Sequence, residues 1–347
     1  MATGASGLRH FEDVSVGETF TYGAYPVTKA EIFEYAHAYD PQPHHIDEEA
    51  AMRSLTKGLC ASGWHSCAMF MRLHFDGWLN QYASLGGAGI DEVRWLKPVR
   101  PGHILQGRTL IVDKRASQSR PEIGIVRVKH EMRNQHDEAL LTMELSQLIR
   151  VRGAAPAKPV AKSKPGVVAA PTASSTTGQS ESARNYFEDL VIGTRRELGS
   201  HTFTAAEIKM FAGKYDPQAF HLDEEAAKTS IMGALCASGW HTAAHYIGAN
   251  IRSRQQNEAK ITGRGEAMAV WGPSPGFKDL KWPKPVFAGD TVTYSQTISG
   301  KVDLKSRPER GLLQHLGEGR NQHGEIVFQV TGQILVPRRV PLQIAAG

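Results

Sequence analysis

An aspartate and a histidine five positions apart occur twice in this chain, each time in the segment Asp-Pro-Gln-x-x-His. The first pair is Asp40 and His45, and the second is Asp216 and His221. Near pH 7 an aspartate is ionised and a histidine is largely neutral, so together they can hold a water molecule and take its proton. Prolines stiffen the segment and fix the separation of the two side chains. We therefore expect these four residues to be catalytic.

A serine and a glycine follow each pair at matching distances. Ser62-Gly63 and Ser238-Gly239 lie in the heptapeptide LCASGWH, which occurs twice letter for letter. We expect each glycine near a helix start, where free N–H groups and the helix dipole favour negative charge and a ligand can approach the backbone. These four residues are therefore expected to bind a substrate carbonyl oxygen. Water activation beside such a site suits the addition of water to a double bond conjugated with a carbonyl, or the reverse dehydration.

Structural roles compete with this interpretation. An aspartate in such a loop is commonly a turn former or a helix cap, and a duplicated structural loop would also recur. Both spacings persist although much of the remaining sequence differs between the copies, which favours catalysis. His44 corresponds to Phe220 and is not expected to be catalytic. For His65 and His241, which recur after the glycines, packing and function are equally compatible with the pattern.

The elements that must position these residues follow from hydrophobic spacing. A helix is expected after Thr28, capped by a box with Glu31, then a short helix near Asp47 and a longer helix from Ser62. The rest of each copy reads as long strands, so the fold class is α+β with a helix wrapped by an antiparallel sheet. Residues expected to pack on helix faces or in the core are Trp64, Trp240, Cys60, Cys67, Cys236, Ala68, Met71, Phe75 and Trp78.

The whole chain is an internal repeat. The two copies match at an offset of 176 residues up to Trp240 and of 187 from Trp282, so the second copy carries eleven extra residues between them. We expect domains at 8–152 and 185–340. Between them, residues 153–184 are rich in Ala, Pro, Ser, Thr and Lys without an aromatic residue, which predicts a flexible linker that lets the copies pack face to face.

Composition narrows the class of protein. The 347 residues are 41% hydrophobic and 22% charged, which is typical of globular domains. Three cysteines cannot form a disulfide framework and lack zinc-site spacing, so we expect a cytoplasmic protein without a metal. No signal peptide or membrane span is expected. The net charge of +5 is spread along the chain, which fits an anionic small ligand and argues against nucleic acid or membrane partners.

These motifs resemble the MaoC-like dehydratase family, which includes the (R)-specific enoyl-CoA hydratases. The resemblance rests on the two Asp-Pro-Gln-x-x-His segments, each followed by a Gly and a helix, and on WLKPVRPGH and WPKPVFAGD. It implies two tandem hotdog domains paired within one chain. It also implies that Asp and His activate water for its reversible addition to a trans-2-enoyl-CoA, giving a 3-hydroxyacyl-CoA, while the Gly amide binds the thioester oxygen. The chain departs from the family pattern at Ala219, Ser62, Ser238, Met71 and Ile247, which puts the choice of substrate in doubt.

The resemblance also implies an acyl-CoA substrate and no separate cofactor, because coenzyme A is part of the substrate. Candidates for binding its phosphates are the cations that recur at matched positions, Lys97, Lys284, Arg133 and Arg320, and each also fits solvated surface charge. A homo-oligomer of the double unit is compatible with the family.

Two other functions stay open on the same fold: an acyl-CoA thioesterase and a non-catalytic acyl-thioester binding protein. The helices after Gly63 and Gly239 differ strongly in sequence. This difference leaves two interpretations, either two pockets for different acyl groups or one vestigial site.

Overall fold

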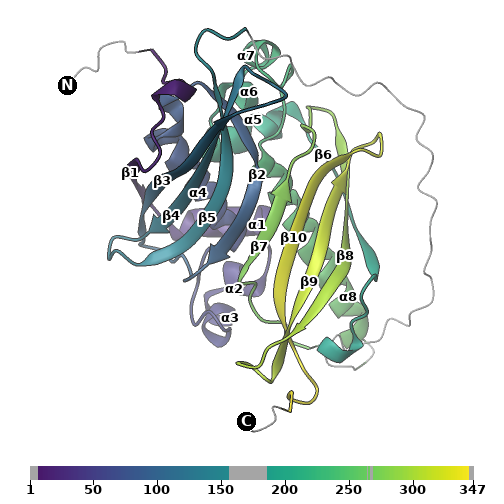
Figure 1. Cartoon of the computed structure of the whole chain (residues 1–347). Helices are drawn as coiled ribbons and strands as arrows, with labels where there is room; N and C mark the ends of the chain where they lie inside the picture. Colours follow the sequence, from purple (N-terminus) through teal and green to yellow (C-terminus); the bar gives the residue numbers. More distant parts are fainter. Residues whose placement is uncertain (1–6, 156–185, 264, 266–268, 344–347) are drawn as a thin grey trace.

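The computed structural model describes residues 7–155, 186–263, 265 and 269–343, which form two halves with the same order of main elements (Figure 1). The predicted linker, residues 153–184, lies almost entirely outside the described residues. In each half a strand precedes three short helices, a long helix and four strands. This order confirms the duplication and the α+β class.

The elements of the first half are η1 (Phe11–Asp13), β1 (Thr19–Pro26), α1 (Lys29–Tyr39), α2 (Pro43–Ile46), α3 (Glu48–Arg53), α4 (Gly63–Gly77), η2 (Leu79–Gln81), β2 (Ser84–Trp95), β3 (Ile104–Ala116), β4 (Ile123–Arg133) and β5 (Ala139–Arg150). Those of the second half are η3 (Phe187–Asp189), β6 (Arg195–Thr202), α5 (Ala205–Tyr215), α6 (Ala219–Leu222), α7 (Glu224–Thr229), α8 (Gly239–Thr262), β7 (Gly276–Lys281), β8 (Thr291–Asp303), β9 (Arg310–Arg320) and β10 (Ile326–Pro337).

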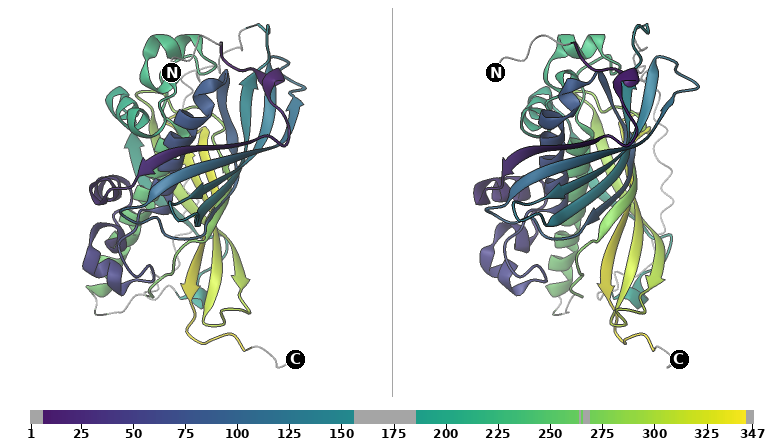
Figure 2. Two further views of the ribbon diagram at one scale, coloured as in Figure 1. Left: turned by 90° about the vertical axis from the view of Figure 1, so that its left-hand side faces the viewer. Right: turned by 60° about the vertical axis from the view of Figure 1, so that its left-hand side comes forward.

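All ten strands form one antiparallel sheet in the order β1-β3-β4-β5-β2-β7-β10-β9-β8-β6. The order of the second five strands mirrors that of the first five. The halves join through β2 and β7, where Val93 pairs with Phe277. The halves therefore meet edge to edge, and the expectation of face-to-face packing is wrong. The helices lie on one side of this strongly curved sheet (Figure 2).

The two long helices form the interior of the molecule. Ser62 and Ser238 cap α4 and α8 by accepting hydrogen bonds from the N–H groups of Trp64 and Trp240. The predicted apolar face of α4 is confirmed by its buried Trp64, Cys67 and Ala68. Trp64 stacks on Phe277 of the other half with ring centroids 4.6 Å apart, so the core crosses the boundary between the halves.

One capping prediction is wrong and explains a difference between the halves. At α5 the side chains of Thr204 and Glu207 form a complete capping box. At α1 Thr28 accepts from the N–H of Glu31, but the Glu31 carboxylate accepts from the Tyr25 hydroxyl at 2.5 Å and lies 3.5 Å from His65. The carboxylate serves tertiary contacts in the first half and the helix end in the second.

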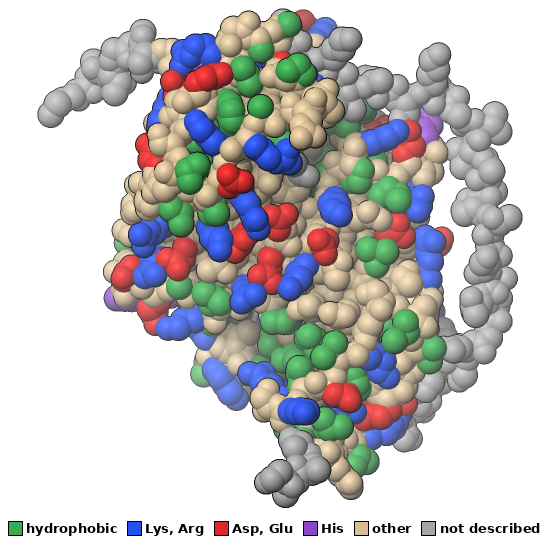
Figure 3. All heavy atoms as spheres, in the orientation of Figure 1, with side chains coloured by type: hydrophobic (Ala, Val, Ile, Leu, Met, Phe, Trp, Pro, Cys, Tyr) green, Lys and Arg blue, Asp and Glu red, His purple; other side chains and the backbone are tan. Residues whose placement is uncertain are grey.

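On the outer face of the sheet, cations and carboxylates lie beside one another (Figure 3). Glu92, for example, pairs with both Arg94 and Lys278 at the joint between the halves. Among the described residues, no helix is long and apolar enough to cross a membrane.

Candidate active sites

Each aspartate that the sequence predicts to be catalytic closes a helix. Asp40 is the C-terminal cap of α1 and Asp216 that of α5, and both are buried. The chain then makes a single helical turn, α2 or α6, which carries His45 or His221 back over the aspartate. The sequence did not predict this turn. Pro43 starts it in the first half and Ala219 in the second, so the departure at Ala219 leaves the backbone unchanged.

Two neutral donors orient each carboxylate in the same way. In the first half the Ser62 hydroxyl donates to Asp40 Oδ2 at 2.6 Å, and Gln42 Nε2 donates to Oδ1 at 2.9 Å. In the second half Ser238 and Gln218 donate to Asp216 at the same distances. Burial raises the pKa of Asp40, and the hydrogen bonds from Ser62 and Gln42 oppose this rise. The serines, expected at the oxyanion site, thus have their hydroxyl groups on the carboxylates.

The position of the imidazole proton follows from its hydrogen bond. His45 Nδ1 lies 2.8 Å from the carbonyl oxygen of Cys60, and His221 Nδ1 lies 2.7 Å from that of Cys236. A carbonyl only accepts, so Nδ1 carries the proton and Nε2 of the neutral ring has a free lone pair. Burial lowers the pKa of His45 to about 4, and it also lowers the pKa of His221. Both rings are therefore neutral at pH 7.

These contacts correct the expectation for two cysteines. Cys60 and Cys236 lie before the long helices rather than on them, and their carbonyl groups set the orientation of the histidines. Cys67 is the one that packs on the buried face of α4.

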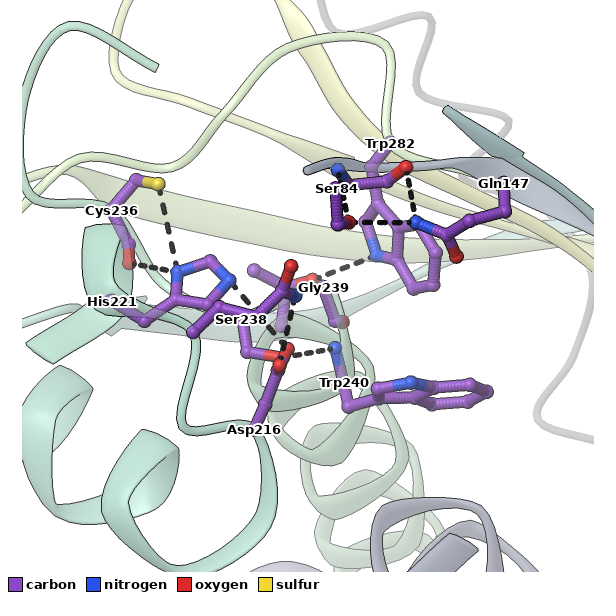
Figure 4. Close-up of polar contacts among 12 residues, drawn as sticks. Ser84, Gln147, Asp216, His221, Cys236, Ser238, Gly239, Trp240 and Trp282 are labelled. Atoms are coloured by element: carbon purple, nitrogen blue, oxygen red, sulfur yellow. Dashed lines mark hydrogen bonds and ion pairs between the residues drawn. The ribbon is translucent and has the colours of Figure 1, made fainter. Parts of the chain in front are cut away.

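The free nitrogen of each histidine faces its aspartate. His45 Nε2 is 3.8 Å from Asp40 Oδ2. His221 Nε2 is 3.5 Å from Asp216 Oδ2, and Figure 4 shows this second pair. Both atoms are acceptors, so no proton joins them directly. A water molecule that donates one hydrogen to each would satisfy both acceptors and leave its oxygen lone pairs free to attack.

A glycine N–H lies beside each pair at the start of a long helix. Gly63 and Gly239 are the first residues of α4 and α8, and their N–H groups make no hydrogen bond within the described part of the chain. Each glycine lies against an indole ring: an added Cβ would come within 2.5 Å of Trp95 or 2.4 Å of Trp282. Packing thus requires glycine, and the helix dipole favours an oxyanion at this N–H.

The recurring His65 and His241 are fully buried packing residues. His65 stacks on Tyr35, with ring centroids 4.2 Å apart, and its Nε2 lies 3.2 Å from the Tyr215 hydroxyl of the other half. His241 stacks on Phe211 and lies 3.2 Å from His245, measured between the Nε2 atoms. These contacts account for both residues without a catalytic role.

The four phosphate candidates lie near the β4–β5 and β9–β10 turns, each in an ion pair. Lys97 pairs with Glu138, Lys284 with Glu325, Arg133 with Glu131 and Asp137, and Arg320 with Glu318. Their role toward coenzyme A stays a prediction. No group of three or more potential metal ligands occurs among the described residues.

Sequence reasoning missed several residues of the sites. Gln42 and Gln218 are the third residues of the repeated motif, so their recurrence was a usable signal. Trp95 and Trp282 also recur, but their contact with the glycines depends on how β2 and β7 cross the helix starts. The contact made by the Cys60 carbonyl could not be predicted, because a backbone group is not marked by any residue type.

Comparisons with known proteins identify the fold and the family of this chain. An (R)-specific enoyl-CoA hydratase of Rhodospirillum rubrum is 28% identical over 160 residues, which are 45% of this chain and 94% of the relative. A solved structure described as a putative MaoC domain protein dehydratase, from Chloroflexus aurantiacus, has a TM-score of 0.75 at 16% identity and covers 98% of this chain and 100% of its own.

A second solved structure, a conserved hypothetical protein of Mycobacterium tuberculosis described as having a double hotdog fold, has a TM-score of 0.69 at 13% identity and covers 94% of this chain and 98% of its own. At such identities the two structures show the fold, which is a double hotdog. The family model described as the MaoC like domain matches residues 13–134 and 189–313, well over half of the chain. The chain therefore belongs to the MaoC-like dehydratase family.

Proposed function

We propose that the protein is an acyl-CoA hydratase that reversibly adds water to a trans-2-enoyl-CoA and forms a 3-hydroxyacyl-CoA. The observation that carries this proposal is the convergence of two buried acceptors, Asp40 Oδ2 and His45 Nε2, beside the unpaired N–H of Gly63. The same set recurs at Asp216, His221 and Gly239. The similarity to the R. rubrum hydratase supports the same reaction class.

The geometry suits each step of a hydration. The thioester oxygen accepts from the Gly63 N–H at the α4 N-terminus, which stabilises the negative charge that develops when C3 is attacked. The water held by Asp40 and His45 gives its oxygen to C3 and one proton to an acceptor of the pair. A proton then passes from the pair to C2. One water is thereby added across the double bond, and because both acceptors lie on one side of it the addition is syn.

The helix cap contributes by positioning. Ser62 holds Asp40 Oδ2 through its hydroxyl while that hydroxyl accepts from the N–H of Trp64, so the carboxylate and the helix start move as one unit. The Cys60 carbonyl holds His45 in the tautomer whose Nε2 can take a proton. The coenzyme phosphates would bind near Lys97, Arg133 and their counterparts, in exchange for the carboxylates that pair with these cations.

The test is an assay of the full chain with trans-2-enoyl-CoAs of several chain lengths, following both the enoyl thioester absorbance and free thiol. Loss of absorbance with formation of 3-hydroxyacyl-CoA and without thiol supports hydration. Thiol release from acyl-CoAs would instead establish a thioesterase. Tight binding without turnover, unchanged in the Asp40→Asn, Asp216→Asn double variant, would establish a binding protein.

A further inference from the structure

The first site has a wall that comes from the second half of the chain. Along α8, Arg252 Nη1 donates to the carbonyl oxygen of Ala38 at 3.4 Å, and Gln255 Nε2 donates to that of Pro41 at 2.8 Å. These carbonyls flank Asp40. Figure 2 shows α8 running beside the helices of the first half. Residues around position 254 of α8 are therefore neighbours of the first site and lie about four helical turns from the second.

Two half-buried arginines lie in this region, and neither makes an ion pair with a carboxylate of the described residues. Arg254 lies on the face of Trp271, 4.4 Å from guanidinium carbon to ring centroid, and makes no ion pair with a described carboxylate. Glu258 acts on it only electrostatically, from beyond ion-pair distance. Arg196 on β6 donates to two neutral amides, Asn250 Oδ1 at 2.9 Å and Gln296 Oε1 at 3.3 Å.

Both arginines stay charged in this setting. Burial lowers the pKa of Arg254 to about 10, which is still far above neutral, and it also lowers the pKa of Arg196. Two like charges shielded from water destabilise the fold unless an anion lies near them. An interior of this kind is suited to an anionic ligand, which a guanidinium binds through paired hydrogen bonds.

The first half has aromatic residues at the positions that correspond to these two arginines. The 176-residue offset matches Arg196 with Phe20. Counted from the helix starts at Gly63 and Gly239, Arg254 of α8 falls at the position of Trp78, which follows the end of α4 at Gly77. Phe20 and Trp78 pack together with ring centroids 6.0 Å apart, and Trp78 is fully buried. The helix of the first half thus ends on an apolar ring cluster, whereas that of the second half carries cations at the matched places.

Arg254 also acts on the helical turn that carries the first histidine. Burial lowers the pKa of His44 to about 4, and the charge of Arg254 acts in the same direction. His44 contacts His45, with ring centroids 4.1 Å apart. The cation therefore lies within electrostatic range of the residue next to His45, on the side from which α8 approaches.

We infer that the first site takes enoyl thioesters whose acyl group ends in a carboxylate, and that Arg254, with Arg196 behind it, binds that carboxylate. The inference rests on the proposed hydratase function and names the substrate class of one of its two sites. Beside the second site, α4 places Arg72, which donates to the carbonyl oxygen of Gly213 and is already paired with Asp76, so this site takes an uncharged acyl group.

The test uses the Asp216→Asn protein, in which only the first site works. Its kcat/KM is measured on two trans-2-enoyl-CoAs of equal chain length, one ending in a methyl group and one in a carboxylate. We expect a preference for the carboxylate, and Arg254→Gln should lower kcat/KM for that substrate by about tenfold to a hundredfold with little change for the methyl substrate. The retained methyl activity reports that the variant is folded. Lys260→Gln, which removes a charge exposed on the same helix, is the matched control.

Three outcomes would overturn the inference alone: no preference for the carboxylate, an equal loss on both substrates, or an equal loss in Lys260→Gln. A second experiment repeats the comparison with the pantetheine thioesters of the two substrates, which lack the nucleotide phosphates. The Arg254 effect should persist there, and its disappearance would assign Arg254 to a coenzyme phosphate instead. Failure of the unmodified protein to hydrate any enoyl thioester would overturn the proposed function itself.

Discussion

The two halves hold nearly identical reacting groups within different walls. The hydrogen bonds to Asp40 and Asp216 have equal lengths, and the distances from histidine Nε2 to aspartate differ by only a few tenths of an ångström, at 3.8 and 3.5 Å. By contrast, α4 has 15 residues and is followed by buried Trp78, while α8 has 24 residues and carries Arg254 at the same distance from its start. The halves have therefore diverged in the residues around the two sites and have kept the residues that hold the aspartate and the histidine.

The largest expected effect separates the two sites. Asp40→Asn should lower kcat for carboxylated substrates by about 10²- to 10⁴-fold, because an amide cannot accept the proton. Asp216→Asn should leave only the slower hydration of uncharged substrates at the first site. The double variant should lose both activities. Steady-state kinetics on both substrates measures this, and full turnover in the double variant would refute the site assignment.

The glycines at the helix starts come next. Gly63→Ala places a Cβ within 2.5 Å of the Trp95 ring, so the ring or the helix start must shift and displace the N–H that we propose binds the oxyanion. We expect a loss of up to about 10²- to 10³-fold in kcat at the first site and destabilisation of about 1–3 kcal/mol. Gly239→Ala should do the same at the second site only.

A matched control exists in Gly213→Ala. This helical glycine has its nearest neighbour, Leu222, 3.9 Å from the added Cβ, so the change should be tolerated in both activity and thermal unfolding. A similar loss there would show that the effects at Gly63 and Gly239 are unspecific.

A smaller effect is expected at the serines. Ser62→Ala removes the hydrogen bond to Asp40 and the cap of α4, and should lower first-site kcat by about tenfold and stability by about 1 kcal/mol. Because that hydrogen bond holds the pKa of Asp40 down, the acidic limb of the pH–rate profile should move to higher pH. Thr28→Ala removes the cap of α1 alone and should leave the profile unchanged.

The smallest expected effect is that of pH between 6 and 8. Burial lowers the pKa of His45 to about 4, so its Nε2 stays unprotonated and kcat should be flat in this range. Stability has its own dependence on pH. Burial lowers the pKa of His45, His74 and His241 below the unfolded value of about 6.5. Their contribution to the free energy of unfolding is therefore complete above about pH 6.5 and is lost as the pH falls toward about 4. Urea unfolding at pH 5 and pH 7 measures this, and equal stability would contradict it.

The parts of the sites that the sequence predicted are those that depend on the spacing of residues within one segment of the chain. Asp40, His45, Gly63 and the α4 start were predictable because their spacing recurs in one chain. Helix α2 and the Cys60 carbonyl contact were not, since they depend on how the loop folds back on the helix start. The capping box at Glu31 failed because Tyr25 and His65 compete for the same carboxylate.

The wall residues could have been found but were not. The exchange of Phe20 for Arg196 is visible in the repeat alignment, and Arg254 lies as far from Gly239 as Trp78 does from Gly63. Its meaning needed the structure, because only the contacts of Arg252 and Gln255 with Ala38 and Pro41 show that this part of α8 serves the other half's site.

The central claim is that a water held between aspartate and histidine adds to an enoyl thioester bound at the glycine N–H. Its most direct test is to react a trans-2-enoyl-CoA with the protein in heavy water and to analyse the product by NMR. We predict a 3-hydroxyacyl-CoA with one deuterium at C2, delivered to the same face as the hydroxyl group at C3. Deuterium on the opposite face, or thiol release without hydration, would contradict the account.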